Sequence, residues 1–231
     1  MDNLLRLAIL FSLLTWLVTQ PALAIQGVSR LPICYNFSCK VKDLIDIEPN
    51  HWAEVSGWFF PKATTPAEER KQIKQAIGWM EVVVGKYTPT HRDTGLDLEY
   101  GGEFPGQLDC IDESLNTTTY LQLFKDRGLI RHHRVLERAY RRAIFDQHWA
   151  GQIQELETGD RYVVDSWFQK NGILPYIQEY EQWMDIPFFF SSNIDNSTEY
   201  DAYQDEKPSL WKRLKNRVSG QDSNTATQSG G

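Results

Sequence analysis

The sequence predicts an α+β fold in which a helix that carries a cysteine packs on an antiparallel sheet that carries a histidine and an aspartate. Two segments with helical signals, at 65–85 and 110–127, supply the helices. Residues 148–157 alternate in polarity, and a short turn leads to a second strand at 161–165, so this pair predicts a hairpin. No internal repeat is visible, and the length favours one domain.

Residues 1–24 have the features of a secretory signal peptide. A short polar start precedes an apolar run from Leu7 to Val18 and the small-residue pattern Ala22-Leu23-Ala24. The apolar run is shorter than the roughly 20 residues that span a bilayer. We therefore expect cleavage after this pattern and a periplasmic or secreted mature chain. Asp2 cancels the charge of Arg6, so an uncleaved anchor is the alternative.

The composition bears on the class of partner. The chain carries a net charge of −7, and an acidic protein without a basic patch in its folded part is a poor binder of nucleic acid. No Gly-rich phosphate loop is present. Aromatic residues are abundant, with 8 Trp, 10 Tyr and 11 Phe, which fits a packed core as well as a substrate groove.

The three cysteines divide into a pair and a single thiol. Cys34 and Cys39 are spaced for a small disulfide loop, and an exported chain meets an oxidising compartment. A redox-active dithiol is the alternative, although such pairs usually lie closer, as Cys-x-x-Cys. The pairing leaves Cys110 alone. A single thiol in an exported protein is either buried or functional.

The first elements after the disulfide loop lead into a long helix. A short strand is predicted at Val41–Ile47, and the aromatic segment His51–Phe60 forms either a helical turn or a strand. Thr65 then caps a helix, Pro66 takes its first position, and Glu68 completes a capping box. Apolar residues recur in this helix at spacings of four, three and four, and they predict its buried face: Ile73, Ile77, Met80 and Val84.

A long loop, Tyr87–Gly106, delivers the chain to the second helix. Loops of this length are often functional, or else disordered. The second helix is expected from Cys110 to Arg127, with Asp109 as its cap and Gly128 as its stop. The cysteine therefore lies at a helix start, where unpaired N–H groups and the helix dipole lower the pKa of a thiol.

The second half of the domain is mostly strand. A strand is predicted at Leu129–Leu136, a basic connection at Tyr140–Phe145, and the two hairpin strands at 148–157 and 161–165. Pro175–Trp183 is expected to form a short helix or turn.

Residues 191–231 read as a flexible polar tail. The tail contains a short basic amphipathic segment, Leu210–Val218. This segment is either a solvated helix or a weak contact with an anionic membrane surface or a partner.

Cys110, His148 and Asp165 form the candidate catalytic site. His148 begins one hairpin strand and Asp165 ends the next, and antiparallel neighbours bring the two within reach. A carboxylate that orients an imidazole beside a thiol is a nucleophile–base–orienter chain. We expect thiol-dependent acyl transfer or hydrolysis on a peptide or protein substrate, with no cofactor and no metal.

Three motifs carry a resemblance to a known superfamily: Gly106-Gln107-Leu108-Asp109-Cys110, His148-Trp149-Ala150 and Tyr162-Val163-Val164-Asp165. They resemble the transglutaminase-like superfamily of papain-type folds, which includes bacterial transglutaminase-like cysteine peptidases. The resemblance implies a papain-like domain at 25–190, with Cys110 as nucleophile, His148 as base and Asp165 as orienter. It also implies that Gln107 donates its amide to an oxyanion.

Longer segments are similar to a family of exported proteobacterial proteins with no assigned activity. These segments are Ile33–Cys39, Asp109–Ser114, Asn116–Leu121 and Val164–Phe168. The similarity supports the domain limits and implies no substrate.

Other residues argue against a catalytic thiol, or have an ordinary structural explanation. Asp109, Asp112 and Glu113 surround the cysteine with negative charge, which would raise the pKa of its thiol. A catalytically inactive domain of the same fold, serving as an envelope binding or assembly protein, is therefore the alternative. The pair His132-His133 points to opposite faces of a strand and makes a poor metal site. The remaining cations predict a solvated surface or a guide for an acidic substrate: Arg131, Arg134, Arg138, Arg141 and Arg142.

Overall fold

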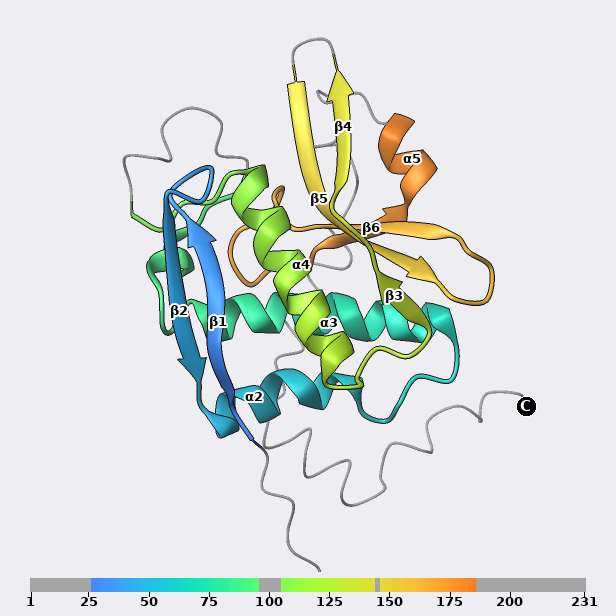
Figure 1. Cartoon of the computed structure of the whole chain (residues 1–231), viewed down its shortest axis with the longest axis horizontal. Coiled ribbons are helices and arrows are strands. Elements are labelled where there is room, and N and C mark those ends of the chain that lie inside the picture. The colour runs from blue at the N-terminus through green and yellow to red at the C-terminus, as the bar shows by residue number, and fades with distance from the viewer. Residues whose placement is uncertain (1–25, 96–104, 144–145, 186–231) are drawn as a thin grey trace, which may run out of the picture.

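The computed structural model describes residues 26–95, 105–143 and 146–185, and they form a mixed α/β structure with antiparallel sheets (Figure 1). The helix α4 (Cys110–Asp126) lies between a two-stranded sheet and a five-stranded sheet. The signal peptide and the tail predicted at the two ends lie outside the described residues. Within these residues, no helix combines the length and the apolar character needed to cross a membrane.

The smaller sheet pairs β1 (Val28–Tyr35) with β2 (Val41–Ile47). The bounds of β2 match the prediction, whereas β1 was not predicted. The aromatic segment that follows forms the helix α2 (Pro49–Ser56) and a single 3-10 turn at Gly57–Phe59. Of the two alternatives predicted for this segment, the helical one is therefore confirmed. Its residues Trp52, Val55 and Phe59 are buried together in the main core.

The helix α3 (Pro66–Val84) begins where the capping signal places it. The Thr65 hydroxyl accepts from the Glu68 N–H at 3.2 Å. The Glu68 carboxylate, however, reaches back to the N–H and hydroxyl of Thr64, at 2.8 and 2.7 Å, so the box closes one residue earlier than predicted. The predicted apolar face is confirmed, since its four residues are all buried: Ile73, Ile77, Met80 and Val84.

The loop before α4 contains a 3-10 turn at Pro89–Arg92, and its residues 96–104 are outside the described part. Asp109 caps α4, and the capping box is closed by Asp112. The threonines inside α4 are held by packing and side-chain bonds. Thr119 donates to the Leu115 carbonyl at 2.9 Å, and the Thr117 hydroxyl lies 3.4 Å from that of Ser166.

The larger sheet has the order β3–β5–β6–β7, and β4 also pairs with β5. The predicted hairpin is confirmed as β5 (Asp146–Glu155) and β6 (Arg161–Asp165). The remaining strands are β3 (His133–Val135), β4 (Ala139–Ala143) and β7 (Tyr176–Glu179).

Three sequence predictions in this sheet were wrong in extent or type. The strand predicted at 129–136 covers only 133–135, and residues 140–143 of the predicted basic connection belong to the strand β4, while its last two residues lie outside the described part. The segment at 175–183 divides into β7 and the short helix α5 (Tyr180–Asp185). In β4, Tyr140 stacks on Trp149 with ring centroids 4.4 Å apart. This cross-strand pair stabilises a strand that its charged residues do not indicate.

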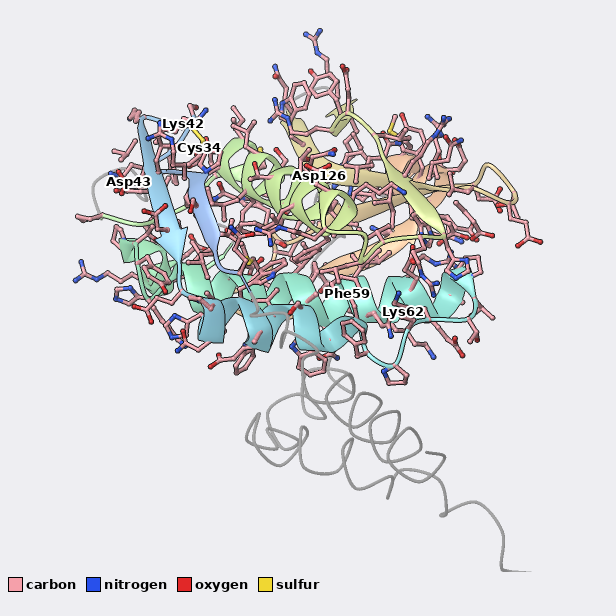
Figure 2. The ribbon with its side chains drawn as sticks, turned by 60° about the horizontal axis from the view of Figure 1, so that its bottom comes forward. Cys34, Lys42, Asp43, Phe59, Lys62 and Asp126 are labelled. Carbon is pink, nitrogen blue, oxygen red and sulfur yellow. A yellow bond between two sulfur atoms is a disulfide. The ribbon has the colours of Figure 1, made fainter. Side chains whose placement is uncertain are left out.

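Two hydrophobic clusters follow from these layers. The main core fills the space between α2, α3, α4 and one face of the larger sheet, and Figure 2 shows α4 between the sheets above α3. A smaller cluster covers the other face of the sheet, where Ala139, Ala150 and Val163 pack against Trp183 of α5. The candidate site lies where β5 begins and β6 ends, next to this second cluster.

Candidate functional site

His148 and Asp165 form a buried pair on neighbouring strands. The Nε2 atom of His148 lies 2.7 Å from Oδ2 of Asp165, and each side chain is only 1% exposed. The indole N–H of Trp183 donates to the same carboxylate oxygen at 2.9 Å. The structure therefore brings together two of the three predicted catalytic residues, and it adds a tryptophan that sequence reasoning missed.

Aromatic rings surround the His148 imidazole. Its centroid lies 4.9 Å from that of Trp167, 5.2 Å from that of Phe168 and 5.6 Å from that of Trp183. Rings this close exclude water and strengthen the bond between the imidazole and Asp165. Trp167 follows Asp165 closely in sequence. Trp183 comes from a separate helix, and no local motif predicts its contact with His148.

The hydrogen bonding fixes the tautomer of the neutral imidazole. Since Asp165 accepts at Nε2, that nitrogen carries the hydrogen and Nδ1 is left with a lone pair. Among the described residues, Nδ1 has no hydrogen-bond partner although it is buried. A buried acceptor without a partner is uncommon, and a catalytic role is one explanation for it. His148 therefore presents one basic nitrogen that can accept a proton.

Cys110 is the first residue of α4 and is partly buried. Its Sγ lies 3.8 Å from the carbonyl oxygen of Gln147, the residue that precedes His148 on β5. After burial and the charges of nearer carboxylates, the charge of Asp165 also contributes to raising the pKa of Glu113 on the first turn of α4. The helix start therefore brings the thiol to the strand segment that carries the base.

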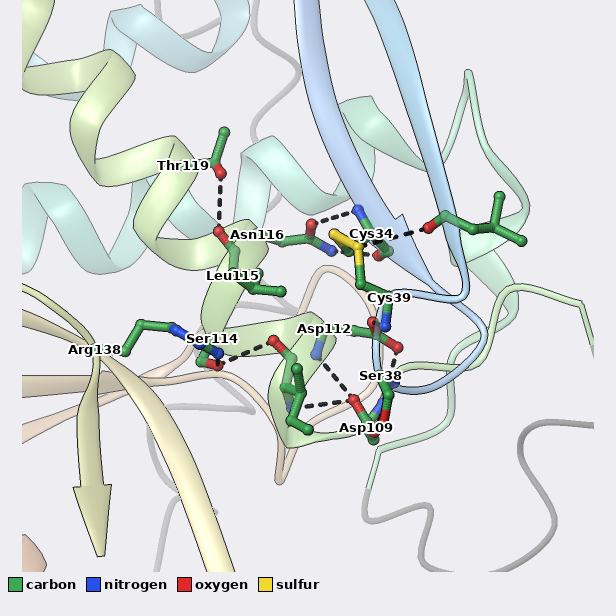
Figure 3. Close-up of a disulfide and its surroundings, with 12 residues drawn as sticks. Cys34, Ser38, Cys39, Asp109, Asp112, Ser114, Leu115, Asn116, Thr119 and Arg138 are labelled. Atoms are coloured by element: carbon green, nitrogen blue, oxygen red, sulfur yellow. Dashed lines mark hydrogen bonds between the residues drawn. A yellow bond between two sulfur atoms is a disulfide. The ribbon is translucent and has the colours of Figure 1, made fainter.

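The acidic neighbours of Cys110 bind the disulfide loop (Figure 3). The Asp109 carboxylate accepts from the Ser38 N–H at 2.8 Å and from two N–H groups of its own helix. Asp112 accepts from the Cys39 N–H at 2.6 Å. These backbone donors neutralise part of the negative charge that the sequence placed around the thiol.

The disulfide between Cys34 and Cys39 is present, which confirms the predicted pairing. Four consecutive residues of its loop, from Asn36 to Cys39, adopt the left-handed conformation with φ between 54° and 65°. Non-glycine residues adopt this conformation only at a cost. The loop is held by Asn116 of α4, whose side chain accepts from the Cys34 N–H and donates to the Cys34 carbonyl, both at 2.8 Å.

Burial keeps protons on several carboxyl groups behind the thiol. It raises the pKa of Asp112 to about 7, with a contribution from the charge of Asp109. Burial, followed by the charges of Glu81 and other neighbours, raises the pKa of Glu113 well above its usual value. Burial also raises the pKa of Glu81 to about 8. At neutral pH the thiol therefore faces less negative charge than the sequence suggests.

Gln107 is buried and braces the loop before α4. Its amide N–H donates to the Arg92 carbonyl at 2.7 Å, and its amide oxygen accepts from the hydroxyl of Thr94 at 3.2 Å. These bonds hold the segment that leads into the cysteine-bearing helix. The oxyanion role of Gln107 remains a prediction.

The predicted solvated cationic surface was only partly right. Arg141 is buried, with its guanidinium 4.5 Å from the Trp183 ring centroid, whereas Arg131 is exposed, as predicted, and donates to the Ala63 carbonyl. Arg138 is partly buried between α4 and β5. Arg134 and Arg142 are exposed, as predicted. The buried arginines stack on tryptophans, and this pairing between distant segments could not be inferred from the sequence.

The two adjacent histidines have structural roles. His133 is buried, and its Nδ1 lies 2.8 Å from Glu69, which also accepts from the backbone N–H groups of the same segment. His132 lies 3.3 Å from the Ala63 carbonyl. In the part of the chain that the structure describes, no group of three or more His, Cys, Asp or Glu side chains could hold a metal ion.

Comparison of the chain with protein-family models, with curated proteins and with solved structures found no match. The class of the protein is therefore defined by its fold and its site alone. These are a mixed α/β fold with antiparallel sheets, a buried His148–Asp165 pair, and a helix-start cysteine whose Sγ lies 3.8 Å from the Gln147 carbonyl.

Proposed function

We propose that this protein is an exported thiol-dependent acyl transferase or hydrolase that acts on peptide or amide bonds through Cys110, His148 and Asp165. The observation that carries the proposal is the buried His148–Asp165 pair, whose second imidazole nitrogen is left without a partner. The start of α4 brings Cys110 to the adjacent residue of the same strand. This combination supplies a nucleophile, a base and an orienter.

The mechanism follows from the tautomer. Nδ1 of His148 takes the proton of the Cys110 thiol, and the sulfur then bonds to the substrate carbonyl carbon. Asp165 stabilises the imidazolium through Nε2. The imidazolium returns its proton to the leaving amine as the carbon–nitrogen bond breaks, which leaves a thioester on the cysteine. Water completes a hydrolysis, whereas a second amine completes a transfer.

The fold and the disulfide give further support. A helix whose first residue is a cysteine, packed against an antiparallel sheet with His and Asp on adjacent strands, is the arrangement that the resemblance to the transglutaminase-like, papain-type superfamily implies. The Cys34–Cys39 disulfide supports export, because disulfides persist in oxidising compartments. We therefore place the protein in the periplasm or outside the cell.

A catalytically inactive binding or assembly protein is the second candidate. One observation favours it: the Cys110 thiol bonds to the Gln147 carbonyl, and the buried Nδ1 of His148 has no hydrogen-bond partner among the described residues. A catalytic thiol would instead give its proton to the imidazole. Apo sites often hold such bonds loosely and tighten them only around a substrate.

Acylation by an activated ester tests the proposal. Incubation with 4-nitrophenyl acetate should release a burst of nitrophenol and leave an acetyl group on Cys110, located by mass spectrometry of the intact chain and its peptides. We expect Cys110→Ser to abolish the burst and His148→Ala to slow it by about 100-fold or more. His132→Ala, a matched substitution remote from the site, should leave the burst unchanged. Equal acylation of wild type and Cys110→Ser would overturn the proposal and favour the binding protein.

A further inference from the structure

Arg138 occupies the boundary between α4 and β5. It comes from the short connection between β3 and β4, and its guanidinium donates to the Ser114 hydroxyl at 3.0 Å (Figure 3). On the other side, the guanidinium lies 4.6 Å from the centroid of the Trp149 ring. A planar cation that bonds to a helix and stacks on a strand is held in one position.

Cys110 lies along the same boundary. Ser114 follows Cys110 by four residues, so the two side chains share one face of α4. On the strand, the thiol reaches the carbonyl of Gln147, two residues before Trp149. The guanidinium thus bonds to α4 one helical turn along from the residue that carries the thiol. Burial lowers the pKa of the guanidinium, and a negative charge on Cys110 opposes that shift.

We infer that Arg138 is a positioning residue whose cation stabilises the thiolate of Cys110; this rests on the proposed function. The charged and titratable groups on the elements around the thiol include Asp109, Asp112, Glu113, His148, Asp165, Arg138 and Arg142, the last of which pairs with Gln147 across β4 and β5. Burial keeps Glu113 protonated, and the carboxylate charge that remains at the start of α4 favours the neutral thiol. Arg138 opposes it with a charge that stays positive wherever a thiol titrates.

The stacking makes the cation effective. Partial burial between α4 and Trp149 reduces screening by salt and water, so the guanidinium acts more strongly than an exposed arginine at the same distance. The bond to Ser114 also gives this residue an ordinary structural role, which is to tie the β3–β4 connection to α4. An electrostatic role and a purely structural role therefore have to be separated by a measurement of the thiol itself.

The rate of Cys110 alkylation by iodoacetamide, measured against pH, separates the two roles. Arg138→Met should raise the midpoint of the profile by about one pH unit and lower the rate near neutral pH by about fivefold. Arg138→Lys should restore most of the rate because it keeps the charge. Arg134→Met removes an exposed arginine of β3 and should leave the profile unchanged. If Arg138→Met fails to fold, Ser114→Ala, which frees the guanidinium, should shift the midpoint in the same direction by less.

The outcomes distinguish this inference from the proposed function. If Arg138→Met leaves the midpoint unchanged while His148→Ala raises it, the inference fails and the proposed function stands. If only the anionic reagent iodoacetate reacts more slowly with Arg138→Met, the residue recruits anions and the inference fails as well. If the wild-type thiol itself shows an ordinary midpoint near pH 8.5, both the inference and the proposed function fail.

Discussion

Asp165 holds its position through two donors that meet at one oxygen. Oδ2 accepts from His148 Nε2 at 2.7 Å and from Trp183 Nε1 at 2.9 Å. A buried carboxylate needs such donors, because each bond to a charged group contributes roughly 1.5–3 kcal/mol and a missing one leaves the charge poorly solvated. Trp183 thus links α5 to the orientation of the imidazole.

Replacement of Trp183 by Phe keeps the ring contact with His148 and removes the bond to Asp165. We expect the free energy of unfolding to fall by about 2 kcal/mol. The rate of Cys110 alkylation near neutral pH should fall by about threefold to tenfold, because the carboxylate orients the imidazole less well. Trp79→Phe is the matched control, since Trp79 of α3 loses an indole bond to Glu54 of α2, away from the thiol. An equal loss of alkylation rate in both variants would contradict the role of Trp183.

At the scale of elements, Gly151 sets the distance between β5 and α4. A Cβ atom at this position would lie 2.7 Å from Cγ2 of Thr117 and 3.2 Å from the Val164 carbonyl. The helix approaches the sheet closely because the strand has no side chain here. This close contact keeps the start of α4 in register with His148.

Gly151→Ala should therefore lower the free energy of unfolding by about 1–3 kcal/mol through overpacking. Adding Thr117→Ser removes the methyl group that the new Cβ meets and keeps the hydroxyl near Ser166. We expect the double variant to recover at least half of the loss in urea unfolding. Additive losses, with no recovery, would show that Thr117 is not what the new side chain meets.

The disulfide loop is a second element-level support of the site. It supplies the N–H donors that bind Asp109 and Asp112 on either side of the thiol. If the loop relaxes from its left-handed conformation, both carboxylates lose those donors, and the start of α4, whose N–H groups stabilise a thiolate, is held less firmly. The loop therefore links the oxidation state of Cys34 and Cys39 to the environment of Cys110.

The double variant Cys34→Ala/Cys39→Ala should lose about 2 kcal/mol of stability, as expected for a short closed loop. It should also alkylate Cys110 more slowly near neutral pH, by about twofold to fivefold, because the thiolate is less favoured. Tyr35→Phe, which breaks only a bond to Asp43 within the same hairpin, is the control. A double variant with unchanged alkylation would separate the loop from the thiol.

At the scale of the whole molecule, buried carboxyl groups make stability depend on pH. Glu81 is fully buried, accepts from the Gly172 N–H at 2.8 Å, and has its pKa raised to about 8 by burial. Its pKa in the unfolded chain is near the ordinary value of 4.5. Between these two values the folded chain binds more protons than the unfolded chain, so stability must fall as the pH rises.

We predict that the free energy of unfolding decreases between about pH 5 and pH 8, by on the order of 1 kcal/mol per pH unit for this group. Glu81→Gln removes the titration and should flatten the dependence in denaturant unfolding measured across that range. Glu54→Gln, a substitution at a partly exposed site, should not. A wild-type stability that rises steadily through this range would contradict the assignment.

The sequence predicted those parts of the fold and site that depend on local signals. The helix starts at Thr65 and Asp109, the hairpin and the disulfide all have short-range patterns, and the structure contains each of them. Strand β4 and the tryptophan bonded to Asp165 depend instead on partners distant in sequence. The same is true of Arg138, which the sequence placed on a solvated surface and the structure places beside α4.

The most direct test of the central claim is the pH titration of the Cys110 thiolate, followed by its ultraviolet absorbance and corrected with Cys110→Ser. An activated nucleophile should ionise at least about one pH unit below the ordinary thiol value of 8.5, and His148→Ala should raise that midpoint. A midpoint at or above about 8.5 in the wild-type protein, unchanged by the histidine substitution, would contradict the account.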